Sequence, residues 1–341
     1  MNRNKKAVLL GALASVTLLS GCSIFGGSES VDAPPEQAVS EYVKGIDPVS
    51  VGEQQSRFAA TLYAEDEDGY VTPLGIRLPY STTDFAKTTL RYMVKGGPVE
   101  ELLPEGFQAL LPEGTEVLSM DIDSSTRTAT IDFNEAFTKY AEADERQILE
   151  AVTWAMTSFE TIDNVELWVE GRALKEMPVA RTPLNHPLSR KMGINVELSE
   201  GVNYGRATPV TLYFLNQTAS DFSYYVPVTR LIEYTDDVAA ATVAELAEGP
   251  ADPNKLSGVL FPSAAEVEVS VAGEGLVVDF DASVLASTGE IPSVGVQAVV
   301  LSLTETIATE GVRVTVDGQP QPGGSGAAEA GMPAVVNLYE M

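Results

Sequence analysis

The stretch Thr128-Ala129-Thr130-Ile131-Asp132-Phe133 decides how this chain is organised, because a similar stretch returns as Gly275-Leu276-Val277-Val278-Asp279-Phe280. Each copy is rich in β-branched residues and ends in Asp-Phe, which is typical of a short, half-buried strand. Five further pairs keep the same order, at separations of 147 to 152 residues. They are 61–63 with 211–213, Gly97-Pro98 with Gly249-Pro250, Leu111-Pro112 with Phe261-Pro262, Gln147 with Gln297, and 169–171 with 316–318. The pattern indicates a tandem duplication. Its period is far longer than the roughly 20–50 residues of a solenoid repeat, so we expect two sequential domains.

The first repeat, residues 57–177, predicts the order strand, strand, helix, strand, strand, helix, strand. We place strands at 58–63, 74–78, 116–121, 128–133 and 165–169, a turn at 65–69, a helix from 81–84 to Gly96-Gly97, and a second helix bearing Ile148, Val152, Ala155 and Phe159. This order predicts the α+β class, with a mixed sheet and helices on one of its faces.

The second repeat, residues 206–320, follows the same plan. We place strands at 210–215, 225–231, 267–271, 276–280 and 312–316, a helix at 237–248 closed by Gly249-Pro250, and a helix that Ser293 opens. At 341 residues with 44% hydrophobic content, the chain has enough apolar material for two modest cores.

The N-terminal residues 1–21 read as a lipoprotein signal peptide. Arg3, Lys5 and Lys6 precede an apolar run of about thirteen residues, which is typical of a signal sequence and too short to span a bilayer. The run ends in Leu19-Ser20-Gly21-Cys22, which matches the bacterial lipoprotein processing box. Leu19, Ser20 and Gly21 would form the peptidase box. Cys22, the single cysteine of the chain, would take diacylglycerol. The weaker alternative is an ordinary secretory peptide with an incidental cysteine. Cleavage would remove three cations and no acids.

Three segments have the composition of linkers or tails between or beyond folded domains. Residues 22–56 are rich in Gly, Pro, Ser and Gln, as in a flexible tether that lifts the folded part off the membrane. Residues 178–205 form a bridge that we expect to wrap on the surface and set the orientation of the two repeats. Residues 321–341 are expected to be a disordered tail.

The composition excludes some classes of function. A net charge of −28 argues against a nucleic-acid partner, which would need Lys and Arg to displace counterions. A strongly acidic surface is also explained by solubility at a salty or alkaline exterior, the interpretation that we favour over a basic partner or a cation-rich wall. One cysteine forms no intramolecular disulfide and no cysteine-based metal site.

Candidate catalytic groups are sparse. His186 is the only histidine and lies beside Pro187, a poor setting for a base that must be held near a nucleophile. Neither a His-based metal pattern nor a phosphate-cradling loop is present, so we expect no metal, no cofactor and no catalytic residue. Asp132 and Asp279 recur at equivalent places and could pair as glycan-cleaving acids. We favour a structural role, in which each accepts backbone N–H groups at a strand end.

Two further features have functional and structural interpretations. The acidic run 65–68 loosely resembles a calcium loop but lacks its twelve-residue pattern, so a solvated turn is favoured. Trp154 and Trp168 could stack on a sugar, yet both fall in predicted core elements, which favours packing.

Several longer phrases resemble the GerM-like sporulation and germination lipoproteins, whose two domains are called GerMN domains. The phrases are 92–99, 103–107, 151–154, 174–179, 188–195, 224–229 and 299–305, together with the box at Cys22. The resemblance covers nearly the whole chain except the tether and the tail. The chain departs from the pattern at Ser263-Ala264-Ala265, which replaces the Glu-Gly-Thr of the first repeat.

The resemblance implies a scaffold without enzymatic activity. Such proteins are lipid-anchored on the mother-cell engulfing membrane, face the space between mother cell and forespore, and support the channel complex that links the two cells. Their domains resemble ring-building modules, so the expected partners are membrane lipid through Cys22, channel-complex proteins and the protein itself in a ring. Two alternatives stay open: a peptidoglycan-binding or -processing lipoprotein, and, ranked last, a solute-binding lipoprotein.

Overall fold

The computed structural model of the protein describes residues 57–79, 84–199, 201–265, 267–272, 275–282, 291–307, 309, 311–320 and 336–339. The signal and box residues 1–22, the rest of the predicted tether and residues 321–335 of the predicted tail lie outside these ranges. No helix in the described part of the chain is both long enough and apolar enough to cross a bilayer.

The first repeat contains a hairpin, two helices and a four-stranded sheet. Strands β1 (Arg57–Glu65) and β2 (Val71–Pro79) pair antiparallel. Helix α2 (Phe85–Arg91) follows, and helix α3 (Glu145–Met156) links two parallel neighbours of the sheet, β4 and β5. The sheet has the order β3 (Val117–Asp123), β4 (Thr128–Phe133), β5 (Asn164–Val169) and β6 (Arg172–Ala173).

The second repeat has the same plan with one extra strand. Strand β7 (Glu197–Leu198) pairs parallel with β9 (Ser223–Glu233), which also pairs antiparallel with β8 (Ala207–Gln217). Helices α4 (Val238–Glu248) and α5 (Ser293–Ile307) follow the predicted positions, and Asp237 caps α4 through the N–H of Ala240.

The second sheet has the order β10 (Val267–Ala272), β11 (Gly275–Phe280), β12 (Val312–Val316) and β13 (Gln319–Pro320). Short 3-10 turns lie at Glu135–Thr138, Glu142–Asp144, Arg190–Met192, Tyr204–Arg206 and Pro262–Ala265.

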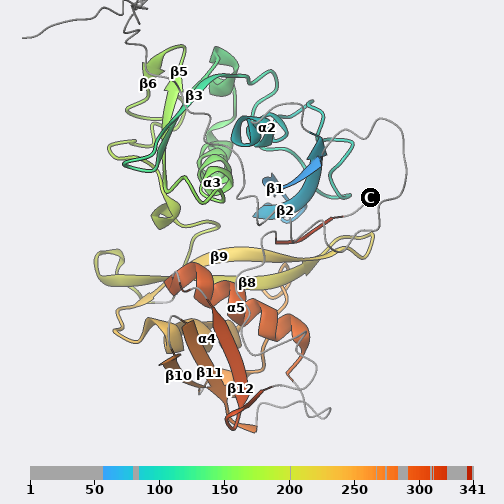
Figure 1. Ribbon diagram of the computed structural model, residues 1–341, viewed down its shortest axis with the longest axis vertical. Coiled ribbons are helices and arrows are strands. Elements are labelled where there is room, and N and C mark those ends of the chain that lie inside the picture. Colours follow the sequence, from blue (N-terminus) through green and yellow to red (C-terminus); the bar gives the residue numbers. More distant parts are fainter. Residues whose placement is uncertain are drawn as a thin grey trace, which may run out of the picture. The chain divides into compact units, whose positions relative to one another are not determined.

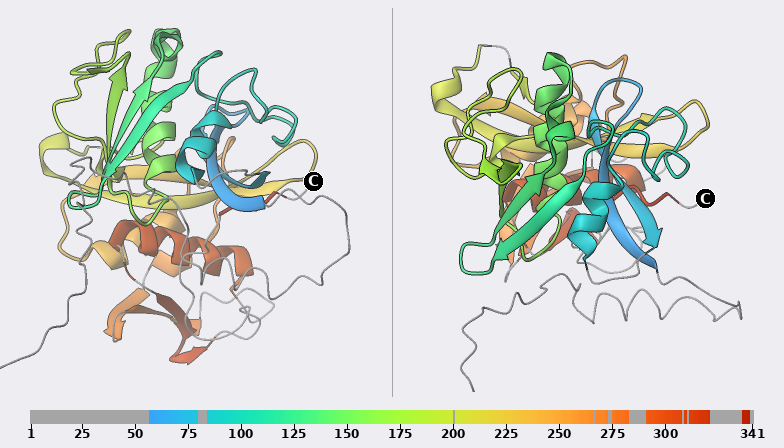
Figure 2. Two further views of the ribbon diagram at one scale, coloured as in Figure 1. Left: turned by 45° about the horizontal axis from the view of Figure 1, so that its top comes forward. Right: turned by 90° about the horizontal axis from the view of Figure 1, so that it is seen from above.

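The helices of each repeat lie between its hairpin and its mixed sheet (Figures 1 and 2). In the second repeat, for example, α4 and α5 contact β8 on one side and β10 and β12 on the other. The predicted α+β class is confirmed, and the mixed sheets are present with helices on one face. The first hairpin of each repeat forms a separate sheet that covers the helices from the opposite side.

This layering explains the sequence of α3. A helix with a sheet on one side only shows an apolar stripe and a polar face. From Ile148 to Met156, however, every residue of α3 is buried, because β1 and β2 cover the side that β5 leaves open. The strand signature at 128–133 is confirmed: Ala129, Ile131 and Phe133 are fully buried and alternate with half-buried neighbours.

Helix α2 is shorter than the pattern of Phe85, Leu90, Met93 and Val94 predicts. It ends at Arg91, because Val94 forms a parallel bridge with Leu111 and the Lys95 N–H donates to the Leu111 carbonyl at 2.9 Å. That backbone is therefore not available for a further helical turn. Phe159, assigned to the second helix, lies just beyond its end and only packs on the core.

Two expectations about the connections are wrong in part. The bridge does not simply wrap on the surface, because Ile194 is fully buried and β7 adds a strand to the hairpin of the second repeat. The tail is not disordered throughout, because residues 336–339 pack beside β2, where Leu338 forms a parallel bridge with Gly75 (the red segment in Figure 1). Backbone pairing with open strand edges orders both segments.

Candidate functional site

The two recurring aspartates close equivalent turns. Both carboxylate oxygens of Asp132 accept from the Gly171 N–H at 3.0 Å, and Asp279 accepts from the Gly318 N–H at 2.9 Å and from the Thr315 hydroxyl at 2.5 Å. Each glycine has a positive φ and follows a residue that also has one, Glu170 or Asp317. Left-handed pairs of this kind make tight hairpin turns. The acids therefore hold the β5–β6 and β12–β13 turns, each within its own sheet.

Replacing Asp132 by alanine is therefore expected to lower the free energy of unfolding by about 1 kcal/mol, the typical net value of such hydrogen bonds. Asp132→Asn should cost less, because its amide oxygen still accepts. Exposed Asp121 on β3 serves as the control, and Asp121→Ala should leave the urea midpoint unchanged. A glycan-release activity that Asp132→Asn abolishes, in a protein of unchanged stability, would contradict the structural role.

The two tryptophans have different environments. Trp154 is fully buried, donates from Nε1 to the Gly193 carbonyl at 3.2 Å and meets the ring of Tyr63 edge-on, so its predicted packing role is confirmed. Trp168 lies on the face of β5 away from α3 and is only partly buried. Its buried Nε1 has no hydrogen-bond partner among the described atoms.

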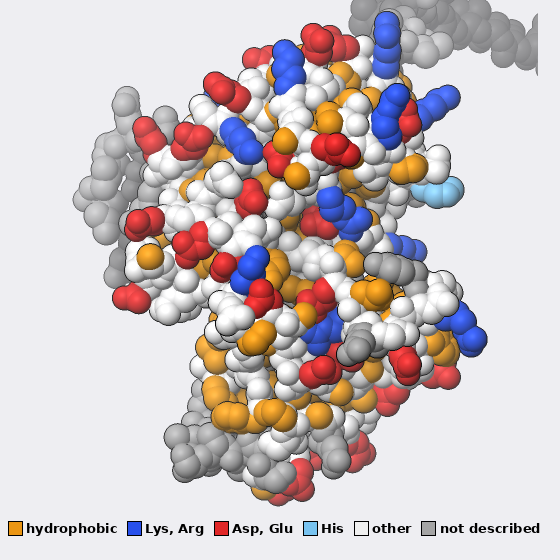
Figure 3. Space-filling model, turned by 180° about the vertical axis from the view of Figure 1, so that it is seen from behind, with side chains coloured by type: hydrophobic (Ala, Val, Ile, Leu, Met, Phe, Trp, Pro, Cys, Tyr) orange, Lys and Arg blue, Asp and Glu red, His pale blue; other side chains and the backbone are white. Residues whose placement is uncertain are grey.

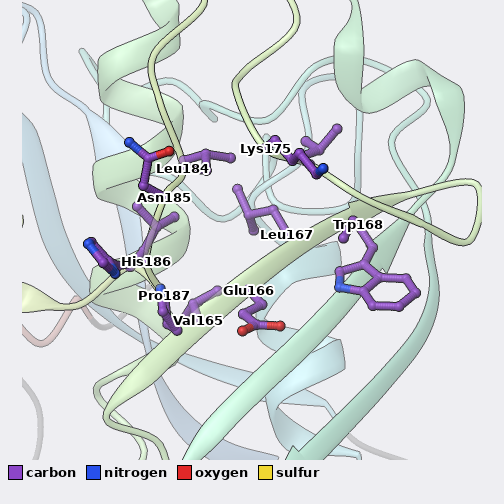
Figure 4. A pocket seen from close by; sticks show the side chains of 12 residues that line it. Val165, Glu166, Leu167, Trp168, Lys175, Leu184, Asn185, His186 and Pro187 are labelled. Atoms are coloured by element: carbon purple, nitrogen blue, oxygen red, sulfur yellow. The ribbon is translucent and has the colours of Figure 1, made fainter.

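Trp168 lines a groove of about 220 Å³ between β5, the strand after it and residues 184–188 of the bridge. Figure 4 shows Trp168 at one end, His186 at the other, and the side chain of Glu166 between them. His186 is exposed and forms no hydrogen bond with any described residue. The groove combines an indole face with the polar side chains of Glu166, Lys175 and His186.

The charged side chains of the described surface are mixed in sign on the face that Figure 3 presents. No group of three or more metal-ligating side chains lies together among the described residues. Figure 3 shows Lys and Arg interspersed with Asp and Glu on the face that it presents. Several polar contacts with buried partners lie instead where the two repeats meet.

The acidic turn of the first hairpin contacts the second repeat. Asp66 is 2% exposed and accepts from the hydroxyl of Tyr224 at 3.1 Å and from Asn216, as well as from the N–H groups of Asp68 and Tyr70. Burial raises the pKa of Asp66, although these hydrogen bonds oppose the increase. The prediction of a solvated turn is therefore wrong at Asp66, because the second repeat covers its carboxylate.

A partly buried ion pair forms a second contact between the repeats. Arg190 of the bridge pairs with Glu305 of α5, donates from Nε to the Thr157 hydroxyl at 3.0 Å and lies 4.5 Å from the Trp154 ring centroid. The equivalent residues Tyr63 and Tyr213 are buried beside this pair, and burial raises the pKa of Tyr63 to about 12. Burial alone would lower the pKa of Arg190, but the Glu305 carboxylate outweighs burial, together with smaller contributions from its other neighbours, and the pKa is raised.

The third contact is the seam, which we define as the facing edges of β2 and β9. No backbone hydrogen bond joins the two strands in the described part of the chain. Asn195 instead accepts from the Val71 N–H and donates to the carbonyls of Val71 and Pro227, all at 2.8–2.9 Å.

Asn337 repeats this arrangement one pair further along. It accepts from the Tyr225 N–H and donates to the carbonyls of Pro73 and Tyr225, each at 2.8 Å. Both asparagines have positive φ, a conformation that asparagine tolerates better than most residues. The two amides therefore act as spacers that join antiparallel strand edges into one bonded surface.

Glu145 fixes the beginning of the bridge on α3. Its buried carboxylate accepts from the N–H groups of Val179, Ala180 and Thr182 and from the hydroxyls of Thr182 and Tyr140, at 2.6–3.2 Å. Burial would raise the pKa of Glu145, but these hydrogen bonds outweigh it and lower the pKa below its ordinary value. Sequence patterns gave no sign of Glu145, Arg190 or the two asparagines, because their partners are distant in the chain.

Comparison with known proteins agrees with the two-repeat organisation. A family described as "Sporulation and spore germination", Germane, matches residues 61–175 and 211–322. The chain belongs to the Germane family. The spore germination protein GerM of Bacillus subtilis (strain 168) is 37% identical to this Germane chain over an alignment 348 residues long. The alignment covers 93% of this chain and 93% of that protein.

A solved structure gives the same relationship. The tandem GerMN domains of the sporulation protein GerM from Bacillus subtilis align with a TM-score of 0.75 and 36% identity, covering 84% of this chain and all of that one. The first GerMN domain of the same protein aligns with a TM-score of 0.38 and 46% identity, covering 39% of this chain and 98% of that one. The chain is thus a Germane protein of sporulation and germination with tandem GerMN domains.

Proposed function

We propose that this Germane protein is a non-enzymatic, lipid-anchored scaffold of sporulation and germination. Its two GerMN domains would support the mother cell–forespore channel complex through protein–protein contacts, with other complex proteins and with further copies as partners. The observation that carries the proposal is that contacts from both repeats and from the bridge hold the domains together, at Asp66, Arg190 and the seam. Such a pair of domains offers one broad surface with fixed geometry.

The use of the polar residues supports a scaffold over an enzyme. The carboxylates that recur, Asp132 and Asp279, are engaged by turn N–H groups. The buried carboxylates of Asp66, Glu145 and Glu305 bind protein donors. A general acid or base would instead need to reach a substrate proton.

Anchoring would place the domains outside the cytoplasm. Residues 1–21 have the features of a lipoprotein signal peptide, and Leu19 to Cys22 match its processing box. Two acyl chains would hold the mature chain at a membrane, at about 0.8 kcal/mol per buried methylene. In sporulating cells the anchor would lie in the outer forespore membrane, with the domains facing the intermembrane space. The tether 22–56 would set the distance between membrane and domains.

Fluorescence localisation of a tagged copy during sporulation tests this proposal. We expect foci or an arc around the forespore, and a dispersed signal for Cys22→Ala. A matched Ser23→Ala variant, which leaves the cysteine in place, should behave as the parent does. An even envelope signal in growing cells, the same in both variants, would count against the anchored scaffold.

A second candidate function, peptidoglycan binding, is favoured only by the groove that Trp168 and His186 line. Binding of the parent protein to purified peptidoglycan sacculi, lost in Trp168→Ala and kept in a variant of the buried Trp154 that remains folded, would support it. Equal binding of Trp168→Ala would exclude this groove as the glycan site.

A further inference from the structure

We propose that the part of the seam filled by residues 336–339 is a peptide-binding groove, and that the C-terminal segment of a second copy of this chain can occupy it in place of the chain's own. The inference goes beyond the scaffold function, because it names a surface and an occupant through which copies connect. It does not depend on the lipid anchor.

The segment docks as a peptide ligand does. The Gly75 N–H donates to the Asn337 carbonyl at 3.0 Å and the Tyr339 N–H donates to the Gly75 carbonyl at 2.9 Å, which is one rung of parallel strand addition. Three further hydrogen bonds come from the Asn337 amide. Adding a strand to a sheet edge is a general mode of peptide recognition, in which backbone bonds give affinity and side-chain pockets give specificity.

Two side chains flank the asparagine in sites of their own. Val336 is 9% exposed and packs with the buried residues Tyr213 and Leu301. The ring of Tyr339 meets the ring of Phe222 edge-on, with centroids 5.1 Å apart. The groove therefore binds an apolar residue at position 336, an asparagine at 337 and an aromatic residue at 339. Residues of both repeats line it.

The two amide spacers of the seam differ in how they are held. Asn195 lies inside the bridge, between the buried Ile194 and strand β7, so it cannot leave without unfolding that segment. Asn337 lies in the described segment 336–339, which residues 321–335 separate from β13 in the sequence. Leaving the seam would therefore disrupt no named helix or strand of either repeat.

A vacated groove would bind another segment of the same kind. Departure of Asn337 and Tyr339 leaves the N–H and carbonyl groups of Gly75 and Tyr225 without these partners, on two facing edges. Unpaired edges are templates for an added chain. The sequence whose fit is demonstrated is that of this protein, so the occupant is a second copy.

Chain length allows such an exchange. Fifteen residues span at most about 50 Å when extended, which is enough to reach a neighbouring molecule. The donor segment and the accepting seam are different surfaces, so the contact is heterologous and can extend from copy to copy. A tethered segment is present at its own seam at an effective concentration on the order of millimolar. Exchange between chains therefore requires a comparably high local concentration of the protein.

Peptide binding tests the groove directly. The receptors are the full chain in detergent and a variant that ends at Val335, and the probe is a fluorescein-labelled peptide of residues 334–341. We expect the peptide to bind the shortened variant at least tenfold more tightly than the full chain, whose groove is filled. A peptide carrying Asn337→Ala should bind at least tenfold more weakly, because it loses three hydrogen bonds.

Crosslinking then tests exchange between copies. A full chain with a photo-crosslinking residue at Tyr339 is mixed with a differently tagged copy that ends at Val335, and we expect a crosslink into β2 or Phe222 of the shortened copy. If the shortened variant fails to fold, the full chain with Asn337→Ala and Tyr339→Ala replaces it as the receptor. A folded receptor that neither binds the peptide nor crosslinks, or equal binding of the Asn337→Ala peptide, would overturn the proposal while leaving the scaffold function untouched.

Discussion

Replacing Arg190 by methionine is expected to lower the free energy of unfolding by about 3 kcal/mol, because it leaves the Glu305 carboxylate buried without its cation. The Glu305 side chain is only 7% exposed, so water would reach its carboxylate poorly once the cation is gone. The Arg190 side chain, 27% exposed, also packs on Trp154 and donates to Thr157, and the loss of both contacts adds to the cost. Urea unfolding followed by tryptophan fluorescence measures the effect, since Trp154 lies directly against the guanidinium.

The matched control is an exposed ion pair of the first repeat. Arg127 and Asp163 are 2.5 Å apart, with side chains 47% and 57% exposed, and Arg127→Met should cost less than about 1 kcal/mol because water screens the pair. The double variant Arg190→Met with Glu305→Leu should recover much of the loss, since no charge then remains buried. Equal effects of Arg190→Met and Arg127→Met would mean that the inter-repeat pair does not stabilise the protein.

Replacing Glu145 by glutamine is expected to cost about 2 to 3 kcal/mol at neutral pH, because hydrogen bonds to a charged acceptor are the stronger ones and an amide cannot accept on both of its ends. The N–H groups of residues 179–182 would lose part of their anchor on α3. Glu142, exposed in the preceding 3-10 turn, gives the control, and Glu142→Gln should change stability by less than about 0.5 kcal/mol.

The advantage of Glu145 over the glutamine variant should depend on pH. The folded carboxyl has a pKa below the ordinary 4.5, so the unfolded chain binds its proton first and stability is lost as the pH falls. The difference between the two proteins is therefore full above about pH 4.5 and shrinks as the pH decreases through the lowered folded value. Denaturant midpoints of the two proteins, measured from pH 7 to pH 3.5, determine how this stability difference changes with pH. A difference that stays constant over this range would show that the carboxylate charge is not what anchors the bridge.

The element order of both repeats could be predicted from the sequence, because alternation and helical spacing are local signals. The strand at 128–133 and the helix from Ser293 to Ile307 agree with their patterns. The early end of α2 could not be predicted, since the competing partner of Val94 is Leu111, seventeen residues away in the chain. Local spacing does not report a backbone bond made elsewhere.

The contacts between the repeats could not be predicted from the sequence for a related reason. An acidic turn such as 65–69 has the composition of a solvated loop, and only the fold brings Tyr224 and Asn216 to Asp66. Asn337 lies in a Gly- and Ala-rich tail, where composition indicates disorder. By contrast, the strand-end aspartates were interpreted correctly, since their partners Gly171 and Gly318 recur in the repeat pattern itself.

The amide spacers of the seam have a consequence for a strongly acidic protein. Asn195 and Asn337 carry no charge at any pH, and their dipolar bonds are short and direct, so ionic strength screens them little. A chain with a net charge of −28 experiences large changes in self-repulsion when salt or pH varies. The seam is thus the part of the inter-repeat contact that responds least to salt and pH, in contrast to the ion pair of Arg190 with Glu305 and the carboxylate of Asp66.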